Sequence, residues 1–268
     1  MSKSTSVATA PIPLSSCSLY GMSLACTDRV GVLNHMFAAL AAGGGGWLIT
    51  ANLDFLRRYV IDADARALYD AADLRVADGM PLVWAARLQG DPLPERVAGA
   101  SLVWLIAERA AAEGRSLYLL GGDGDASARS RRGLTERWPG LKILGASSPR
   151  IASPPTAQDL ASLQELVAHA PDILLVGLGS PKQEQLIHEL RGQLPRTWMV
   201  GVGVTFSFIG GDLRRAPPWM RRLGLEWLHR LAQEPRRLAR RYLVDDLPFA
   251  ARLFAHALRG RWQRRLPA

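Results

Sequence analysis

The chain has 268 residues, of which 48% are hydrophobic and 21% are charged, and its formal net charge is +9. This composition predicts a globular protein that forms one large domain, or one domain with an appendage. It excludes a membrane-spanning helix, because no apolar run reaches the roughly 18 uncharged residues that such a helix requires.

The first 27 residues are rich in Ser, Thr, Ala and Pro, with one Lys and no extended apolar core. This pattern predicts a flexible N-terminal tail over residues 1–27 rather than a secretory signal. Cys17 and Cys26 have no Cys-x-x-Cys partner or nearby histidine ligands, which argues against a zinc site and a disulfide scaffold. A cytosolic location fits this cysteine usage.

From residue 28 the hydrophobic pattern alternates between helical and strand segments. The predicted strands are residues 47–53, 74–77, 116–120, 141–144, 173–176 and 197–202. The predicted helices are residues 28–42, 54–69, 80–88, 101–113, 126–138 and 156–170. This alternation predicts an α/β fold, in which a Rossmann-like, mostly parallel sheet is flanked by helices over residues 28–212.

The last part of the chain, residues 213–268, is predicted to be an Arg-rich helical appendage. It contains fourteen arginines and four acidic residues, so the basic character of the chain belongs to this segment. Such asymmetry points to a polyanionic partner. Trp219, Trp227 and Trp262 lie among the arginines, and amphipathic cationic helices of this kind suit an anionic membrane surface. Nucleic-acid binding and a merely solvated helical hairpin remain alternatives.

Residues 172–184 carry the strongest local signal for a ligand site. A buried strand over residues 173–176 runs into Gly177 and Gly179, which allow a tight turn and close approach of a ligand. The first turn of the following helix is expected to hold Lys182, Gln183 and Glu184. A helix N-terminus beside a lysine favours an anion such as a phosphate. An ordinary loop with exposed charges is the alternative.

Other strand ends finish in polar residues or glycines, at what should be the same edge of the sheet: Thr50 and Asn52, Asp78, and Gly121 with Gly122. Convergence of this kind assembles active sites in α/β proteins. Asp78 is the best candidate for a general base, and its alternative role is to cap the helix that begins at residue 80. Thr50 and Asn52 would orient a hydroxyl or the base, or would satisfy the backbone.

The remaining polar motifs are weaker. Arg96 is a ligand for phosphate or sugar, or an ion-pair partner of Glu95, and the residues alone favour the ion pair. No GxGxxG motif or P-loop is present. The Asp-x-Asp triplets at 62–64 and 123–125 are interpreted as solvated or capping residues rather than metal ligands. The five histidines show no metal-ligand spacing, so no metal site is expected.

An ordered set of motifs resembles the WecG/TagA/CpsF family of bacterial glycosyltransferases, glycosyltransferase family 26. The matching segments are 50–52 (TAN), 77–83 (ADGMPLV), 94–99 (PERVAG), 119–122 (LLGG), 138–141 (WPGL), 177–184 (GLGSPKQE), 215–217 (RAP), 224–227 (GLEW) and 234–237 (EPRR). Two segments depart from the family pattern. Ser207 stands where the family usually has Asp, and residues 147–155 lack a frequent Gly-Tyr pair.

The resemblance implies an inverting transfer of a hexose from a UDP-sugar to a polyprenyl-diphosphate-linked sugar, in the synthesis of an exopolysaccharide or cell-surface polymer. The hexose would be glucose, N-acetylmannosamine or its uronic acid. Asp78 would be the base, with Thr50 and Asn52 beside it as catalytic residues. The residues expected to bind the substrates are Arg96, Gly121, Gly122, Gly177, Gly179, Lys182, Gln183, Glu184, Ser207, Arg214, Arg215, Arg230 and Arg237.

The resemblance also implies the partners and the location. The expected partners are the UDP-sugar donor, the lipid-linked acceptor and an anionic membrane surface, with no cofactor, no metal and no nucleic acid. Residues 213–268 would associate with the inner face of the cell membrane, and the formation of a homo-oligomer is left open. Two alternatives remain: an α/β protein that binds nucleic acid through its Arg-rich segment, and a non-catalytic UDP-sugar sensor.

Overall fold

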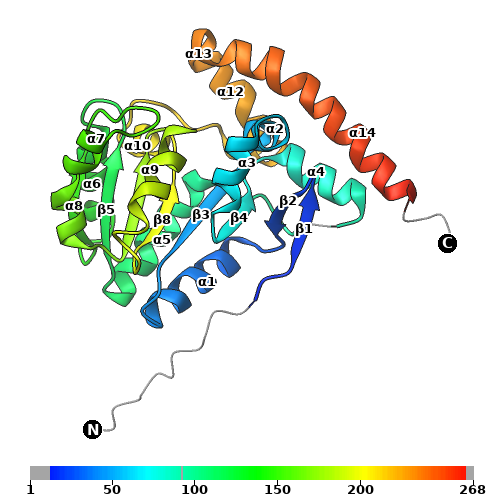
Figure 1. Cartoon of the computed structure of the whole chain (residues 1–268). Coiled ribbons are helices and arrows are strands. Elements are labelled where there is room, and N and C mark those ends of the chain that lie inside the picture. The colour runs from blue at the N-terminus through cyan, green and yellow to red at the C-terminus, as the bar shows by residue number, and fades with distance from the viewer. Residues whose placement is uncertain (1–12, 92, 264–268) are drawn as a thin grey trace.

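Six parallel strands form the central sheet in the computed structural model, which describes residues 13–91 and 93–263 (Figure 1). Their order across the sheet is β4-β3-β8-β7-β5-β6. The strands are β3 (Gly46–Ala51), β4 (Leu74–Ala77), β5 (Ser116–Gly121), β6 (Lys142–Ser147), β7 (Ile173–Gly177) and β8 (Trp198–Gly201). All residues of the central strands β7 and β8 are buried, because helices cover both faces of the sheet. The predicted α/β class is confirmed.

The helices form one layer on each face of the sheet. One face packs against α1 (Arg29–Ala41), α5 (Gly99–Glu113), α6 (Ala126–Arg137) and α10 (Thr205–Ile209). The other face packs against α2 (Leu53–Ile61), α3 (Ala63–Asp70), α4 (Met80–Gln89), α8 (Gln164–His169) and α9 (Lys182–Leu190). Each layer encloses its own hydrophobic core, as the strand–helix alternation predicts.

The single helix predicted over residues 156–170 is in fact two helices, α7 (Ala157–Ala161) and α8. Thr156 and Asp159 form a capping box at the start of α7. At the break, the Ser162 hydroxyl donates to the Asp159 carbonyl, and Leu163 is buried in the core. The helix is interrupted at this point because Ser162 bonds to the backbone and Leu163 packs into the core.

An antiparallel hairpin occupies part of the segment predicted as a flexible tail. Its strands are β1 (Ser16–Leu19) and β2 (Met22–Ala25), and positive φ angles at Tyr20 and Gly21 form the turn. Cys17, Leu19, Met22 and Leu24 are buried in the core. The prediction of a tail is therefore wrong for these residues. Serine supplies the exposed half of the alternating pattern, which made the segment look like a linker. Residues 1–12 of the predicted tail lie outside the described residues.

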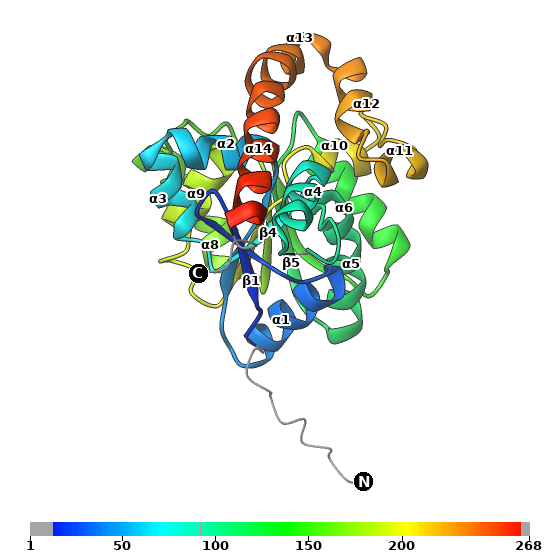
Figure 2. The ribbon, with the colours of Figure 1, turned by 90° about the vertical axis from the view of Figure 1, so that its right-hand side faces the viewer.

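The predicted helical appendage is present, and its last helix packs into the core. It consists of α11 (Pro218–Arg222), α12 (Glu226–Gln233), α13 (Pro235–Ala239), a π-helix η1 (Arg240–Asp246) and α14 (Leu247–Gln263). Helix α14 runs alongside α4 and buries Phe249, Leu253 and Ala257 (Figure 2). The ring of Tyr20 in the hairpin stacks on His256 of α14 with their centroids 4.0 Å apart.

Within residues 13–91 and 93–263, no helix has both the length and the apolar composition that crossing a membrane demands.

Candidate active site

A cavity of about 520 Å³ opens at the carboxyl ends of the strands, beneath the appendage. The segments that follow β3, β4, β7 and β8 form its floor, and α12, α13, η1 and α14 contribute its roof. Its volume lies in the range of about 300–1,000 Å³ that is usual for small-molecule sites. The sheet edge that the sequence predicts as the site therefore carries the cavity.

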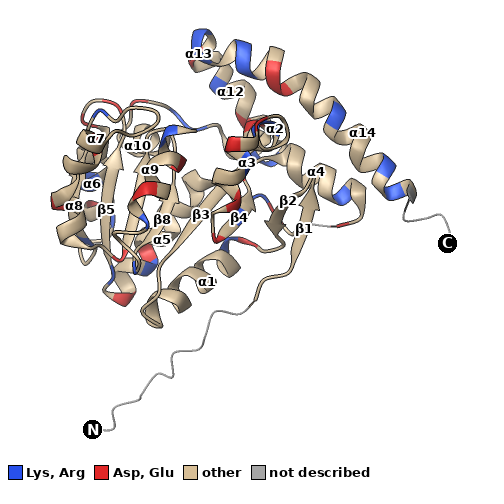
Figure 3. Cartoon of the chain, in the orientation of Figure 1, with Lys and Arg blue, Asp and Glu red and all other residues tan. Residues whose placement is uncertain are grey.

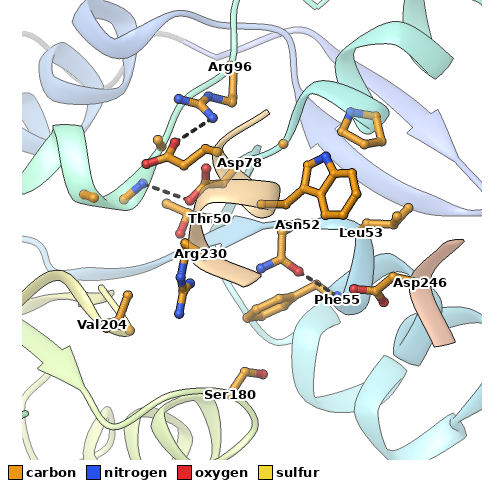
Figure 4. A pocket seen from close by; sticks show the side chains of 18 of the residues that line it. Thr50, Asn52, Leu53, Phe55, Asp78, Arg96, Ser180, Val204, Arg230 and Asp246 are labelled. Carbon is orange, nitrogen blue, oxygen red and sulfur yellow. Dashed lines mark hydrogen bonds and ion pairs between the residues drawn. The ribbon is translucent and has the colours of Figure 1, made fainter. Parts of the chain in front are cut away.

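Asp78 follows β4 directly and lines this cavity (Figure 4). Its N–H donates to the Ala51 carbonyl (2.7 Å), and its Oδ2 accepts from the N–H of Gly99 (3.1 Å), the first residue of α5. The alternative role, capping α4, is wrong because Gly79 occupies the N-cap position without a side-chain hydrogen bond. Asp78 is thus a carboxylate held at the cavity wall by the N-terminus of a different helix.

The surroundings of Asp78 raise the pKa of its carboxyl group to about 6. Burial is the largest cause, because removal from water disfavours the charged form, and the nearby Glu226 adds to the rise. Arg96, the Gly99 N–H and Arg215 act in the opposite direction. Asp78 is therefore ionised at neutral pH but accepts a proton more readily than an ordinary aspartate, which suits a general base.

Thr50 and Asn52, the other predicted catalytic residues, also line the cavity. A side chain at Gly99 would lie 3.1 Å from Thr50 Oγ1, so the glycine lets α5 approach Thr50 and Asp78 closely. Asn52 caps α2, because its Oδ1 accepts from the Phe55 N–H (3.2 Å), and its amide nitrogen lies on the side away from that bond (Figure 4). Asn52 therefore caps a helix and faces the site at once.

Arg96 lines the cavity but does not pair with Glu95, so the favoured ion pair is wrong. Glu95 pairs instead with Arg29 (2.9 Å), and Arg96 Nη1 lies 2.9 Å from Glu226 Oε2 (Figure 4). The two side chains have partners in different parts of the fold: Glu95 pairs with α1, and Arg96 pairs with α12. Arg96 is thereby directed into the cavity and toward the appendage.

The cavity lining has an excess of positive charge. Five arginines line it, together with the carboxylates of Asp78, Glu226 and Asp246; the arginines are Arg96, Arg215, Arg230, Arg237 and Arg241. Arg230 and Arg237 share Glu234 as a partner, at 3.1 and 2.6 Å. One guanidinium group can donate two parallel hydrogen bonds to phosphate oxygens, so a lining rich in arginines suits a diphosphate.

Gly179 and Gln183 connect the β7 turn to the cavity. Gly179 adopts a positive φ of 74° and has no atom within 4 Å of a Cβ placed on it, so a ligand has room to approach the backbone there. Gln183 Oε1 accepts from the Gly203 N–H (3.0 Å), and its Nε2 donates to Glu184 Oε1 (2.7 Å). Gln183 therefore fixes the loop after β8 while its side chain lines the cavity.

Several predicted substrate-binding residues do not line the cavity: Gly121, Gly122, Gly177, Lys182, Glu184, Ser207 and Arg214. The glycines serve strand packing. The Gly122 N–H donates to the Gly177 carbonyl (2.7 Å), and a Cβ on Gly177 would lie 2.6 Å from the Phe206 ring. Glu184 and Ser207 are buried, and burial raises the pKa of Glu184 to about 7. The structure does not bring these residues to the same cavity as Asp78.

Two acidic groups were not identified as site residues from the sequence. Glu226, in the 224–227 segment, bridges Arg96 and Arg215 across more than a hundred residues of chain. Asp246 lies beside the buried Asp54, and Arg241 is 3.5 Å from Asp54 and 3.7 Å from Asp246. Burial, with the charge of Asp54, raises the pKa of Asp246 to about 6. This ion network connects η1 to α2 at the cavity wall.

Of the Asp-x-Asp triplets, the first acts as a cap, as expected: Asp62 caps α3 by accepting from the N–H groups of Asp64 and Ala65. In the second, Asp125 makes no capping hydrogen bond and pairs with Arg129 instead. Throughout the described part of the chain, no three His, Cys, Asp or Glu side chains are grouped so that they could hold a metal ion.

Asp78 and five arginines line one cavity at the carboxyl edge of a parallel sheet, an arrangement that is typical of α/β enzymes. The model of the Glycosyl transferase WecG/TagA/CpsF family matches residues 17–263. The chain belongs to this family, and it is therefore a glycosyltransferase, as the ordered motifs indicate. The match begins at the hairpin and ends with α14, so the appendage lies inside the family region.

Proposed function

We propose that the protein transfers a hexose, with inversion, from a UDP-sugar to a polyprenyl-diphosphate-linked sugar at the inner face of the cell membrane. The donor sugar would be glucose, N-acetylmannosamine or its uronic acid, and the product would enter an exopolysaccharide or cell-surface polymer. The observation that carries the proposal is the meeting of Asp78 with five arginines on one cavity. Family membership supports the glycosyl transfer itself.

In the proposed reaction, Asp78 removes the proton from the acceptor hydroxyl while the oxygen of that hydroxyl attacks the anomeric carbon of the donor sugar. A new glycosidic bond forms on one face of the sugar while the bond to UDP breaks on the other, which inverts the anomeric centre. Asp78 then carries the proton. UDP leaves with added negative charge, and Arg230 and Arg237 are placed to stabilise that charge.

The proposal is tested by an assay for UDP release with a short polyprenyl-diphosphate-sugar acceptor and a panel of the three donors. We expect acceptor-dependent release with one donor and an inverted anomeric configuration of the product by NMR. Release with retained configuration, or no release with any donor, would contradict the proposal. Binding of a UDP-sugar without turnover would instead support the sensor alternative.

The appendage surface supports the proposed membrane association. Basic residues occur along the helices of the appendage (Figure 3), and the same helices carry exposed apolar side chains. Among them are Trp219, Leu223, Leu228, Leu243, Val244 and Leu247, each between 45% and 63% exposed. Apolar side chains that insert into the membrane interface stabilise binding to it. Each basic residue close to anionic lipid contributes about 1 kcal/mol more.

The double substitution of Trp219→Ser with Leu223→Ser is expected to weaken binding to anionic vesicles by about tenfold or more, since both lose apolar area in the interface. Sedimentation with vesicles of phosphatidylglycerol and phosphatidylcholine measures the effect. Val30→Ser is the matched control, because Val30 is 60% exposed on α1, outside the appendage. Unchanged sedimentation of the double variant would remove this surface from the proposal.

A further inference from the structure

Glu226 lies at the start of α12, between two arginines that reach the cavity from different parts of the chain. Its Oε2 is 2.9 Å from Arg96 Nη1, and its Oε1 is 3.1 Å from Arg215 Nε. Arg215 also donates to the Ser101 hydroxyl (2.9 Å). The Glu226 side chain is 15% exposed, so this bridge is mostly shielded from water. Both arginines are thereby fixed in place by one carboxylate.

The same two arginines are the cations that act on Asp78. Arg96 comes from the loop before α5 and Arg215 from the loop before α11. A guanidinium paired with Asp78 would strongly favour the carboxylate form and make it a poor proton acceptor. The Asp78 carboxylate instead accepts its hydrogen bond from the Gly99 N–H, and both arginines are directed to Glu226.

We propose that Glu226 is a positioning residue for the base: by holding Arg96 and Arg215 in a two-sided ion pair, it keeps them from pairing with Asp78. The inference rests on the proposed function in that it takes Asp78 as the proton acceptor. It adds a distinct role for a residue of the appendage. The charge of Glu226 tunes the base across the cavity, in addition to any contact that the appendage makes with substrate.

The charged groups around the pair agree with this role. Burial raises the pKa of Asp78 to about 6, Glu226 adds to the rise, and Arg96, the Gly99 N–H and Arg215 oppose it. Burial would also raise the pKa of Glu226, but Arg215 and Arg96 outweigh it and lower that pKa below its usual value. Glu226 therefore stays ionised throughout the range in which Asp78 titrates. Arg221 of α11 is a further cation close to Arg215 and Glu226, and burial and the charge of Arg215 lower its pKa.

Gly224 allows Glu226 to reach this position. It has a positive φ of 71°, and a Cβ on it would lie 2.8 Å from the Met80 Cβ, so only glycine lets the chain pass the start of α4. Because Glu226 belongs to the appendage and Asp78 to the sheet, the base acquires this environment when α12 is docked. Docking of the appendage is thereby coupled to the proton affinity of Asp78.

The test is an NMR titration of aspartate carboxyl carbons in the full chain labelled with ¹³C, with Asp78→Asn used to assign the Asp78 signal. The wild-type midpoint is expected near 6. In Glu226→Gln we expect the midpoint to move to lower pH by about one pH unit, because the carboxylate is lost and the arginines are free. Glu234→Gln is the matched control, since Glu234 also bridges two arginines, Arg230 and Arg237.

A double variant separates this role from a loosened structure. If the freed arginine causes the change, adding Arg96→Gln to Glu226→Gln should move the Asp78 midpoint back toward the wild-type value. If Glu226 only supports packing, water would reach Asp78 and the midpoint would stay low in the double variant. Such a result, or a Glu226→Gln midpoint equal to that of the wild type, overturns the inference.

Glu226→Asp provides a second measurement in case Glu226→Gln does not fold. It keeps the charge but is too short to hold both arginines, so its midpoint should lie between those of the wild type and Glu226→Gln. A midpoint equal to the wild type, or above it, contradicts the role. The titration needs no turnover, so a failed UDP-release assay would contradict the proposed function and leave this measurement interpretable.

Discussion

Asp78→Asn is expected to lower the rate of sugar transfer by about 10²–10⁴-fold and to leave the dissociation constant for the UDP-sugar nearly unchanged. The amide keeps the shape of the side chain and its hydrogen bond from the Gly99 N–H, but it cannot accept the proton of the acceptor hydroxyl. Steady-state UDP release and isothermal titration with the donor measure the two quantities.

Asp64→Asn is the control, because Asp64 is an exposed residue in the first turn of α3, away from the cavity lining. Near-normal turnover of Asp78→Asn would remove Asp78 as the base.

Asp78→Asn should also be more stable toward unfolding than the wild type at pH 7.5, by about 1–3 kcal/mol. The raised pKa of Asp78 means that the folded state binds its proton more tightly than the unfolded state, so stability falls as the pH rises from 3.8 to about 6, and the full cost is present at pH 7.5. Asparagine removes that cost.

The double substitution of Arg230→Gln with Arg237→Gln is expected to lower kcat/KM by about 10²–10³-fold. Both side chains line the cavity from the appendage, where they can stabilise the charge that develops on the leaving diphosphate. A soluble short-chain acceptor should be used, so that loss of membrane binding does not contribute to the measured rate.

The control for this pair is Arg236→Gln with Arg240→Gln, which removes the same charge from the same segment. Arg236 and Arg240 are exposed and do not line the cavity. Equal losses of kcat/KM in the two double variants would show that net charge matters rather than contact with the diphosphate. A small loss with Arg230 and Arg237 would place the leaving group elsewhere.

The parts of the fold that depend on local periodicity were predictable. The strand over residues 173–176 is continuously apolar and is buried on both faces, and β4 begins and ends at the predicted residues 74 and 77. The hairpin of β1 and β2 was not, because its serines look like a linker until the core contacts of Leu19 and Met22 are known. Burial of alternate residues in a short strand leaves little signal in a Ser-rich segment.

The residues of the candidate site likewise include some that the sequence could predict and some that it could not. Asp78 and Asn52 follow strands directly, and Thr50 lies near the end of β3. Because the ends of parallel strands meet at one edge, the convergence of these residues follows from the strand pattern. Gly121, Gly122 and Gly177 also follow or end strands, yet their backbones pack against one another and against Phe206. A glycine at a strand end predicts close approach, but the sequence does not tell whether a ligand or another backbone approaches.

The sequence by itself determined the α/β alternation, the polar strand ends and the basic C-terminal segment, because each depends on residues close together in the chain. The tertiary structure decided that Arg96 pairs with Glu226 rather than with Glu95, and that Arg215 shares the same carboxylate. It also decided which arginines of the appendage line the cavity that holds Asp78. The physical reason is that ion pairs and burial depend on distances across the fold, and the packing of α11 to α14 over the sheet sets those distances.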